Sequence, residues 1–245
     1  VVPILLLVLL SMIILIFVIW NYADHLNRAF RQLQRLLGNV EEGDFTVELS
    51  EMLTKRKDEI GQMAGTAAHW AELGVTFDAI YSGFLGSAGQ IGLIEDFYRQ
   101  FRREGTLVLV DPVMGDHGKL YPGMSEKMPQ LMKWLCQRAD VIVPNQTEAA
   151  LMLGRPYLET PDQAEVDDLM QALREMTRAS VVLTGISPEE GKLGAAVYDR
   201  ETGQSACPAA PHMPGSYHGT GDVYASALTG AYMAGKTLVQ AGQIA

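Results

Sequence analysis

Five residues near the carboxyl end of the chain have the types and the order that phosphoryl chemistry needs. The sequence HGTGD spans residues 218–222 and directly precedes an apolar stretch with helical character. Gly219, Thr220 and Gly221 would leave backbone N–H groups free at a helix N-terminus, where the donors and the helix dipole attract an anion. Asp222 would then lie beside a bound phosphate, where it could take a proton from an attacking alcohol. An ordinary helix cap with an acidic residue in its first turn explains the same residues.

Polar residues also follow three of the predicted apolar strands. Asp111 comes after TLVLV, Asn145 after DVIVP, and Thr184 after SVVL. Ligands of open α/β sheets bind beyond the carboxyl ends of the strands. These three side chains are therefore candidates for one site together with Asp222.

The elements that must position these residues alternate between strands and helices. The sequence predicts a strand and a glycine turn at 77–86, a strand that runs into a polar loop at 106–116, and strands at 140–145 and 180–185. It predicts helices at 91–103, 129–139, 162–179 and 222–234, and a hairpin at 194–207 that turns at 201–203. Strands that are apolar on both faces and alternate with helices indicate an α/β fold with a parallel sheet and flanking helices.

Longer motifs resemble those of a known family. NQTE, at 145–148, matches the N-x-x-E motif of ribokinase-like kinases, and HGTGD resembles their anion-hole and catalytic-base motif. DPVMGDHGKLY, at 111–121, resembles the signature of pyridoxal kinases, as do FDAIYSGFLGS and PGSYHGTGD. The related hydroxymethylpyrimidine kinases share DPVM but normally diverge after it. Residues 67–245 therefore resemble an incomplete ribokinase-like pyridoxal/pyridoxamine (vitamin B6) kinase domain.

The resemblance implies a role for each motif residue. Asp222 would deprotonate the 5′-hydroxymethyl group of the vitamer, and ATP would supply the phosphoryl group. The implied residues are Gly219, Thr220 and Gly221 for the anion hole, Asp111 and Glu148 for the metal, and Asp116, Tyr121, Asn145, Thr184 and Gly185 for ATP. The implied metal is Mg²⁺, held mostly through water as suits a hard ion, with a monovalent cation as a further candidate.

Other features exclude some classes of function. The net charge of −10 argues against a nucleic-acid surface, and Cys136 and Cys207 have no metal-binding spacing. GAYMAGKT, at 230–237, formally fits the P-loop pattern, but it lies at the end of the predicted helix 222–234 and not after a strand. We therefore interpret it as a helix end with Gly235 near the C-cap. We expect a homodimer.

The amino-terminal residues predict a membrane anchor. Residues 1–20 form an uncharged apolar run, which as a helix would span about 30 Å, the thickness of a hydrocarbon core. Trp20 and Tyr22 fit an interfacial aromatic belt, and Arg28 and Arg31 follow it. We expect residues 1–20 to cross the inner (plasma) membrane, with the kinase part in the cytoplasm.

Residues 21–66 resemble a HAMP domain, the helical signal relay of bacterial receptors. Apolar residues repeat in steps of four and three, at Leu26, Phe30, Leu33, Leu37 and Val40. A glycine-containing connector, EEGDF, and a second helix that opens near DEIG follow. A generic membrane-anchored coiled coil also explains this pattern.

Both ends of the chain look cut, since it starts with Val1 rather than Met and stops at Ala245 within a stretch that reads as a helix. The resemblance implies that the kinase part is truncated at both ends as well. A HAMP unit would require a helical output, whereas a strand is predicted soon after it. We therefore expect an artificial junction near residues 63–68. Two alternative functions stay open: a membrane signalling fragment with an inert kinase remnant, and a hydroxymethylpyrimidine kinase.

Overall fold

The computed structural model describes residues 59–213, 215 and 219–245. The predicted membrane helix at 1–20 and the HAMP-like segment up to residue 58 lie outside these residues. Within the described part, no helix combines the length and the apolarity that crossing a membrane requires. The first described element is the helix α3 (Glu59–Glu72). It includes residues 63–68, and the artificial junction expected there stays a prediction.

Residues 68–245 form one unit around a seven-stranded sheet with the order β1-β2-β5-β6-β7-β8, and β9 also pairs with β7. The strands are β1 (Ala79–Ser82), β2 (Leu107–Val110), β5 (Val141–Ile142), β6 (Ser180–Ile186), β7 (Lys192–Tyr198), β8 (Ser205–Ala206) and β9 (Ala209–Pro211). The first four are parallel to one another, and β7 is antiparallel to β6, β8 and β9. A separate hairpin consists of β3 (Gly115–Asp116) and β4 (Lys119–Leu120).

The sheet is therefore mixed, and the prediction of a parallel sheet is wrong for its second half. The short segment 187–191 joins β6 to β7, whereas a crossover between parallel strands needs about a dozen residues or more. The chain must instead turn back alongside β6. The predicted hairpin is confirmed, because Tyr198 pairs with Ser205 across the turn.

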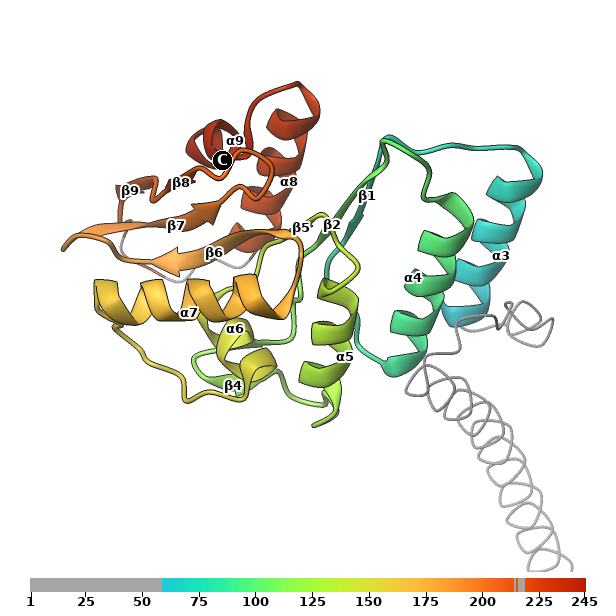
Figure 1. Cartoon of the computed structure of the whole chain (residues 1–245). Coiled ribbons are helices and arrows are strands. Elements are labelled where there is room, and N and C mark those ends of the chain that lie inside the picture. The colour runs from blue at the N-terminus through green and yellow to red at the C-terminus, as the bar shows by residue number, and fades with distance from the viewer. Residues whose placement is uncertain (1–58, 214, 216–218) are drawn as a thin grey trace, which may run out of the picture. The chain divides into compact units, whose positions relative to one another are not determined.

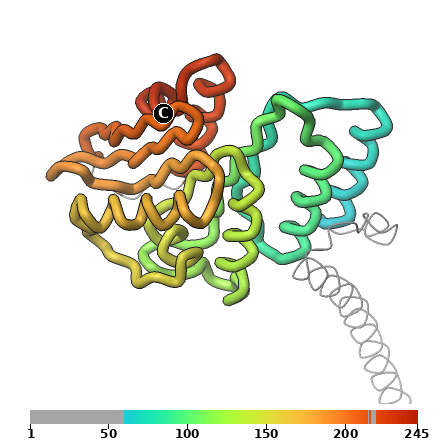
Figure 2. The backbone as a smooth tube through the Cα atoms, viewed as in Figure 1, coloured from blue at the N-terminus to red at the C-terminus, as the bar shows by residue number. Residues whose placement is uncertain are grey.

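Helices cover both faces of the sheet. They are α4 (Ala88–Phe101), α5 (Met128–Cys136), α6 (Gln146–Leu153), α7 (Gln163–Met176), α8 (Thr220–Met233) and α9 (Leu238–Ile244). Figure 1 shows α7 on one side of β6 and β7, and α8 and α9 on the other. Figure 2 shows the chain ending beside these strands, where α9 contacts β7. On that side Ala225, Leu228 and Ala241 pack against Leu109 and Val182 of the sheet.

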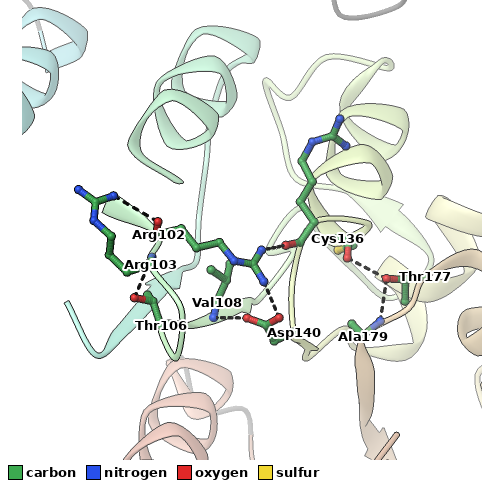
Figure 3. A network of polar contacts seen from close by, with 9 residues as sticks. Arg102, Arg103, Thr106, Val108, Cys136, Asp140, Thr177 and Ala179 are labelled. Carbon is green, nitrogen blue, oxygen red and sulfur yellow. Dashed lines mark hydrogen bonds and ion pairs between the residues drawn. The ribbon is translucent and has the colours of Figure 1, made fainter. Parts of the chain in front are cut away.

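A polar network holds the amino ends of two central strands (Figure 3). Asp140, directly before β5, accepts hydrogen bonds from the Val108 backbone N–H of β2 at 2.7 Å and from the Arg102 guanidinium at 2.6 Å. Arg102 also donates to the Arg138 carbonyl oxygen at 2.6 Å. Because these contacts fix the amino ends of the strands, they also align the carboxyl ends, where an α/β sheet binds its ligands.

Candidate active site

The predicted strand-end residues lie along one edge of the sheet. Asp111 directly follows β2, and its backbone N–H donates to the Ser82 carbonyl oxygen at the end of β1 at 2.9 Å. Further along the edge, Asn145 forms an isolated parallel bridge with Thr184 of β6. The carboxyl ends of β1, β2, β5 and β6 therefore present the candidate residues side by side.

Asn145 and Glu148 form a capping box that begins α6. The Asn145 side chain accepts from the Glu148 N–H, and Glu148 Oε2 accepts from the Asn145 N–H, both at 2.8 Å. Each side chain also reaches the loop after β2: Asn145 Nδ2 donates to the Gly115 carbonyl oxygen at 3.0 Å, and Glu148 Oε1 accepts from the Met114 N–H at 3.2 Å. Since both Glu148 oxygens hold backbone groups, this residue fixes the loop that carries Asp111.

Asp111 and Glu148 are nearly buried, with 5% and 2% of their surface exposed. Burial raises the pKa of Glu148 to about 8, and the nearby Asp111 charge adds to the rise against several backbone hydrogen bonds. Burial likewise raises the pKa of Asp111 to about 7, opposed by the Tyr81 hydroxyl and reinforced by the charge of Asp222. Among the described side chains, no cation forms an ion pair with either carboxyl group.

Two buried carboxyl groups without a cationic partner among the described side chains suit a hard divalent cation such as Mg²⁺. Within residues 59–213, 215 and 219–245, however, no three His, Cys, Asp or Glu side chains gather closely enough to hold a metal ion by themselves. An ion held by Asp111 and Glu148 would need further ligands such as water, which Mg²⁺ usually keeps.

The β3–β4 hairpin places Asp116 and Tyr121 at the same edge. Its turn has positive φ at His117 (49°) and Gly118 (75°), and the Gly118 N–H donates to Thr147 Oγ1 of α6 at 3.0 Å. Burial raises the pKa of Tyr121, and the charges of Glu148, Asp116, Asp111 and Asp222 add to the rise. The Tyr121 hydroxyl is thus within electrostatic reach of four predicted site carboxylates.

The amino end of α8 brings Asp222 to this group. Gly219 is the N-cap, with φ 83°, and Thr220 is the first helical residue. Asp222 lies in the first turn and is exposed to solvent, so an alcohol can approach it. The helix begins two residues before its predicted start, which includes Thr220 and Gly221 in the first turn. His218 lies outside the described residues.

The last two predicted contacts, Thr184 and Gly185, lie where the pairing of β6 with β7 becomes irregular. Gly185 has φ 77°, and its carbonyl oxygen accepts a hydrogen bond from the Gln146 side chain. The P-loop-like segment 230–237 instead forms the end of α8, with Gly235 at φ 84° just after the C-cap. Its interpretation as a helix end is confirmed.

Two residues of this edge were not predicted as site residues. Gln146 links α6 to β6, and the Tyr81 hydroxyl donates to Asp111 Oδ2 at 3.3 Å. Gln146 follows Asn145 directly, inside a recognised motif. Tyr81 stands one residue before the end of β1, and a phenol at the end of this short strand was the available signal.

Comparisons with known proteins find phosphomethylpyrimidine and pyridoxal kinases. A family model described as phosphomethylpyrimidine kinase matches residues 66–245. Pyridoxal kinase PdxY of Corynebacterium diphtheriae is 29% identical over 160 residues, covering 64% of this chain and 55% of that protein. The chain spans about half the length of the curated relatives it matches.

Solved structures show the same fold. Pyridoxal kinase from Lactobacillus plantarum has a TM-score of 0.67 and 34% identity, covering 75% of this chain and 64% of that one. A Bacteroides thetaiotaomicron protein, in an orthorhombic crystal form with pyridoxal, has a TM-score of 0.68 and 35% identity, covering 75% of this chain and 66% of that one. With its mixed sheet, its helix N-terminus at Gly219 and a family match over residues 66–245, the chain belongs to the ribokinase-like family of phosphomethylpyrimidine and pyridoxal kinases.

Proposed function

We propose that residues 67–245 carry the phosphoryl-transfer centre of an ATP-dependent kinase that phosphorylates the 5′-hydroxymethyl group of pyridoxal, pyridoxamine or pyridoxine. The observation that carries the proposal is the burial of Asp111 and Glu148 at the carboxyl edge of the sheet, where Glu148 holds the loop after Asp111 and the charge of Asp222, at an accessible helix N-terminus, acts on Asp111. A general base, an anion-binding helix end and a cation-attracting edge are the parts that phosphoryl transfer requires.

In this proposal, Asp222 takes the proton of the vitamer hydroxyl group as its oxygen attacks the γ-phosphorus of ATP. The bond from that phosphorus to the β,γ-bridging oxygen breaks, and ADP leaves. The backbone N–H groups of Gly219, Thr220 and Gly221 would stabilise the negative charge on the transferred group. Asp116, Tyr121, Asn145, Thr184 and Gly185 would position ATP along the edge of the sheet.

Mg²⁺ would neutralise phosphate charge when bound with the nucleotide. Asp111 would hold it through water because, of the two buried carboxyl groups, it is the one whose pKa the charge of Asp222 raises. Glu148 would contribute through its charge and through the loop that it fixes, since both of its oxygens already accept backbone hydrogen bonds.

The similarity to the pyridoxal kinase of Lactobacillus plantarum and to the Bacteroides protein with pyridoxal supports a vitamin B6 substrate. A second candidate is phosphorylation of a hydroxymethylpyrimidine, the unphosphorylated form of the compound that the family model's description names. Both substrates present a hydroxymethyl group on a flat heteroaromatic ring, so the same transfer centre suits either. Rates measured side by side on pyridoxal and hydroxymethylpyrimidine would separate the two candidates.

The direct test is ATP-dependent formation of pyridoxal 5′-phosphate by the purified chain, with Asp222→Asn as the matched variant. We expect the native chain to form product and Asp222→Asn to lose at least about a hundred-fold in rate while it still binds nucleotide. Equal rates for the two proteins would refute the role of Asp222. A folded native chain that binds Mg-ATP but forms no product would refute the activity of residues 67–245 by themselves.

A further inference from the structure

Tyr81 occupies a position between the sheet and the candidate site. It lies on β1, in register with Leu109 of β2, and its ring packs against the core cluster that β2 shares with α8 and α9. At the end of this packed ring, the hydroxyl group donates to Asp111 Oδ2 at 3.3 Å. The ring is thus fixed by packing, and the hydroxyl reaches the edge of the sheet where Asp111 follows β2.

The bond from Tyr81 constrains a carboxyl group that has few other constraints. The backbone of Asp111 is held by the bond to Ser82, and its side chain accepts a hydrogen bond from the Tyr81 hydroxyl. A carboxyl group can rotate about its terminal torsion, which has broad minima. The Tyr81 bond selects one orientation and engages Oδ2 rather than Oδ1.

The surroundings of this pair place it within the site rather than beside it. The charge of Asp222, in the first turn of α8, raises the pKa of both Tyr81 and Asp111. The turn after β1 also passes close by, since a Cβ atom at Gly83 would lie 3.5 Å from the Tyr81 hydroxyl oxygen. Tyr81 therefore connects the end of β1 to Asp111, within the electrostatic reach of Asp222.

We propose that Tyr81 is a positioning residue, whose hydroxyl group orients the Asp111 carboxylate for binding the metal–nucleotide complex. The inference rests on the proposed function. It adds a requirement for the hydroxyl group. If Tyr81 served only to pack the core, the ring of a phenylalanine would serve equally well.

Tyr224 provides a matched control. Its ring packs against the same core cluster, but its hydroxyl group donates to the backbone carbonyl oxygen of Gly242 at 3.4 Å, away from the carboxyl groups of the site. Tyr81→Phe and Tyr224→Phe each remove one hydroxyl group and keep the packed ring. The two variants differ in whether a site carboxylate loses a partner.

The test measures binding of Mn²⁺ with ADP to the full chain, by the electron paramagnetic resonance signal of free Mn²⁺, and needs neither catalysis nor a vitamer. Because a hydrogen bond to a charged group is lost, Tyr81→Phe should weaken binding by about ten-fold or more. Tyr224→Phe should stay within about two-fold of the native chain. Urea unfolding of both variants shows that each is folded.

A double-variant cycle separates positioning from general packing. If Tyr81 acts through Asp111, then Tyr81→Phe should have no further effect on Mn²⁺ binding in an Asp111→Ala background. Equal binding by the native chain and Tyr81→Phe, an equal loss in Tyr224→Phe, or a full further loss in the Asp111→Ala background would each overturn the inference and leave the proposed function standing. Failure of the native chain to bind Mn²⁺ with ADP would overturn both.

Discussion

Replacing Asp111 with asparagine should stabilise the protein at alkaline pH, because the folded state holds this carboxyl group out of water. Asp111 is nearly buried, and its burial raises the pKa from 3.8 to about 7, with the charge of Asp222 adding to the effect and the Tyr81 bond opposing it. Asparagine has nearly the same shape, and its side-chain oxygen can still accept the hydrogen bond from Tyr81.

The direction of the pKa shift fixes the sign of the pH dependence. A carboxyl group whose pKa is higher in the folded state stabilises the fold below the unfolded pKa, and this contribution is lost as the pH rises towards the folded pKa. Each pH unit in that interval lowers the free energy of unfolding by about 1.4 kcal/mol. Between about pH 5.5 and about pH 7, the Asp111 carboxyl group should therefore lower the stability of the native chain by about 2 kcal/mol.

Asparagine does not titrate, so the stability advantage of Asp111→Asn over the native chain should grow by about 2 kcal/mol between about pH 5.5 and about pH 8. Urea unfolding followed by tryptophan fluorescence, without nucleotide or metal, measures this difference at both pH values. Asp167→Asn, at an exposed carboxylate of α7, is the control and should show no such growth. An advantage that is equal at both pH values, or a loss of stability at about pH 8, would refute the argument from burial.

Two further variants test the loop and the helix that frame the site. Gly118→Ala should cost at least about 1 kcal/mol more in urea unfolding than Gly123→Ala, because both glycines have positive φ but only a Cβ at Gly118 meets the Tyr157 ring, at 2.8 Å. Equal costs would contradict this contact. Asn145→Ala should cost about 0.5–2 kcal/mol as a lost helix cap and should exceed the cost of Asp162→Ala, whose capping box has no bond to the site loop. A smaller cost for Asn145→Ala would show that the bond to the loop contributes nothing.

The carboxyl ends of the parallel strands were predictable because the signals are local. A buried strand appears as a continuous apolar run, and the polar residue that ends it marks the edge, as Asp111 does after β2. The helix N-terminus before Asp222 was equally visible, since glycines before an apolar helix have few other uses. N-x-x-E at 145–148 is itself a capping-box pattern, so the start of α6 could also have been predicted from the sequence.

Strand neighbours and side-chain partners could not be predicted in this way. Whether β7 lies beside β6 depends on the path of the segment 187–191 and not on the composition of either strand. Tyr81 was missed because its alternation with the buried Ile80 and Ser82 shows only that it faces the other side of β1. That its hydroxyl reaches Asp111 depends on the register of β1 with β2, which only the assembled sheet defines.

At the candidate site, the charged carboxylates that favour binding of a metal–nucleotide complex lower the stability of the fold. The folded state disfavours ionisation of Asp111 and Glu148, so the edge that carries them is less stable at the pH at which both are charged. A cation bound with nucleotide would favour the charged forms, and binding to the folded state alone would raise its stability by mass action. Arg102 and Asp140 hold the amino ends of β2 and β5, at the end of these strands opposite the candidate site. Neutralising Asp111 should therefore stabilise the fold and weaken metal–nucleotide binding in the same variant, which is the relation expected when charged groups are kept for function.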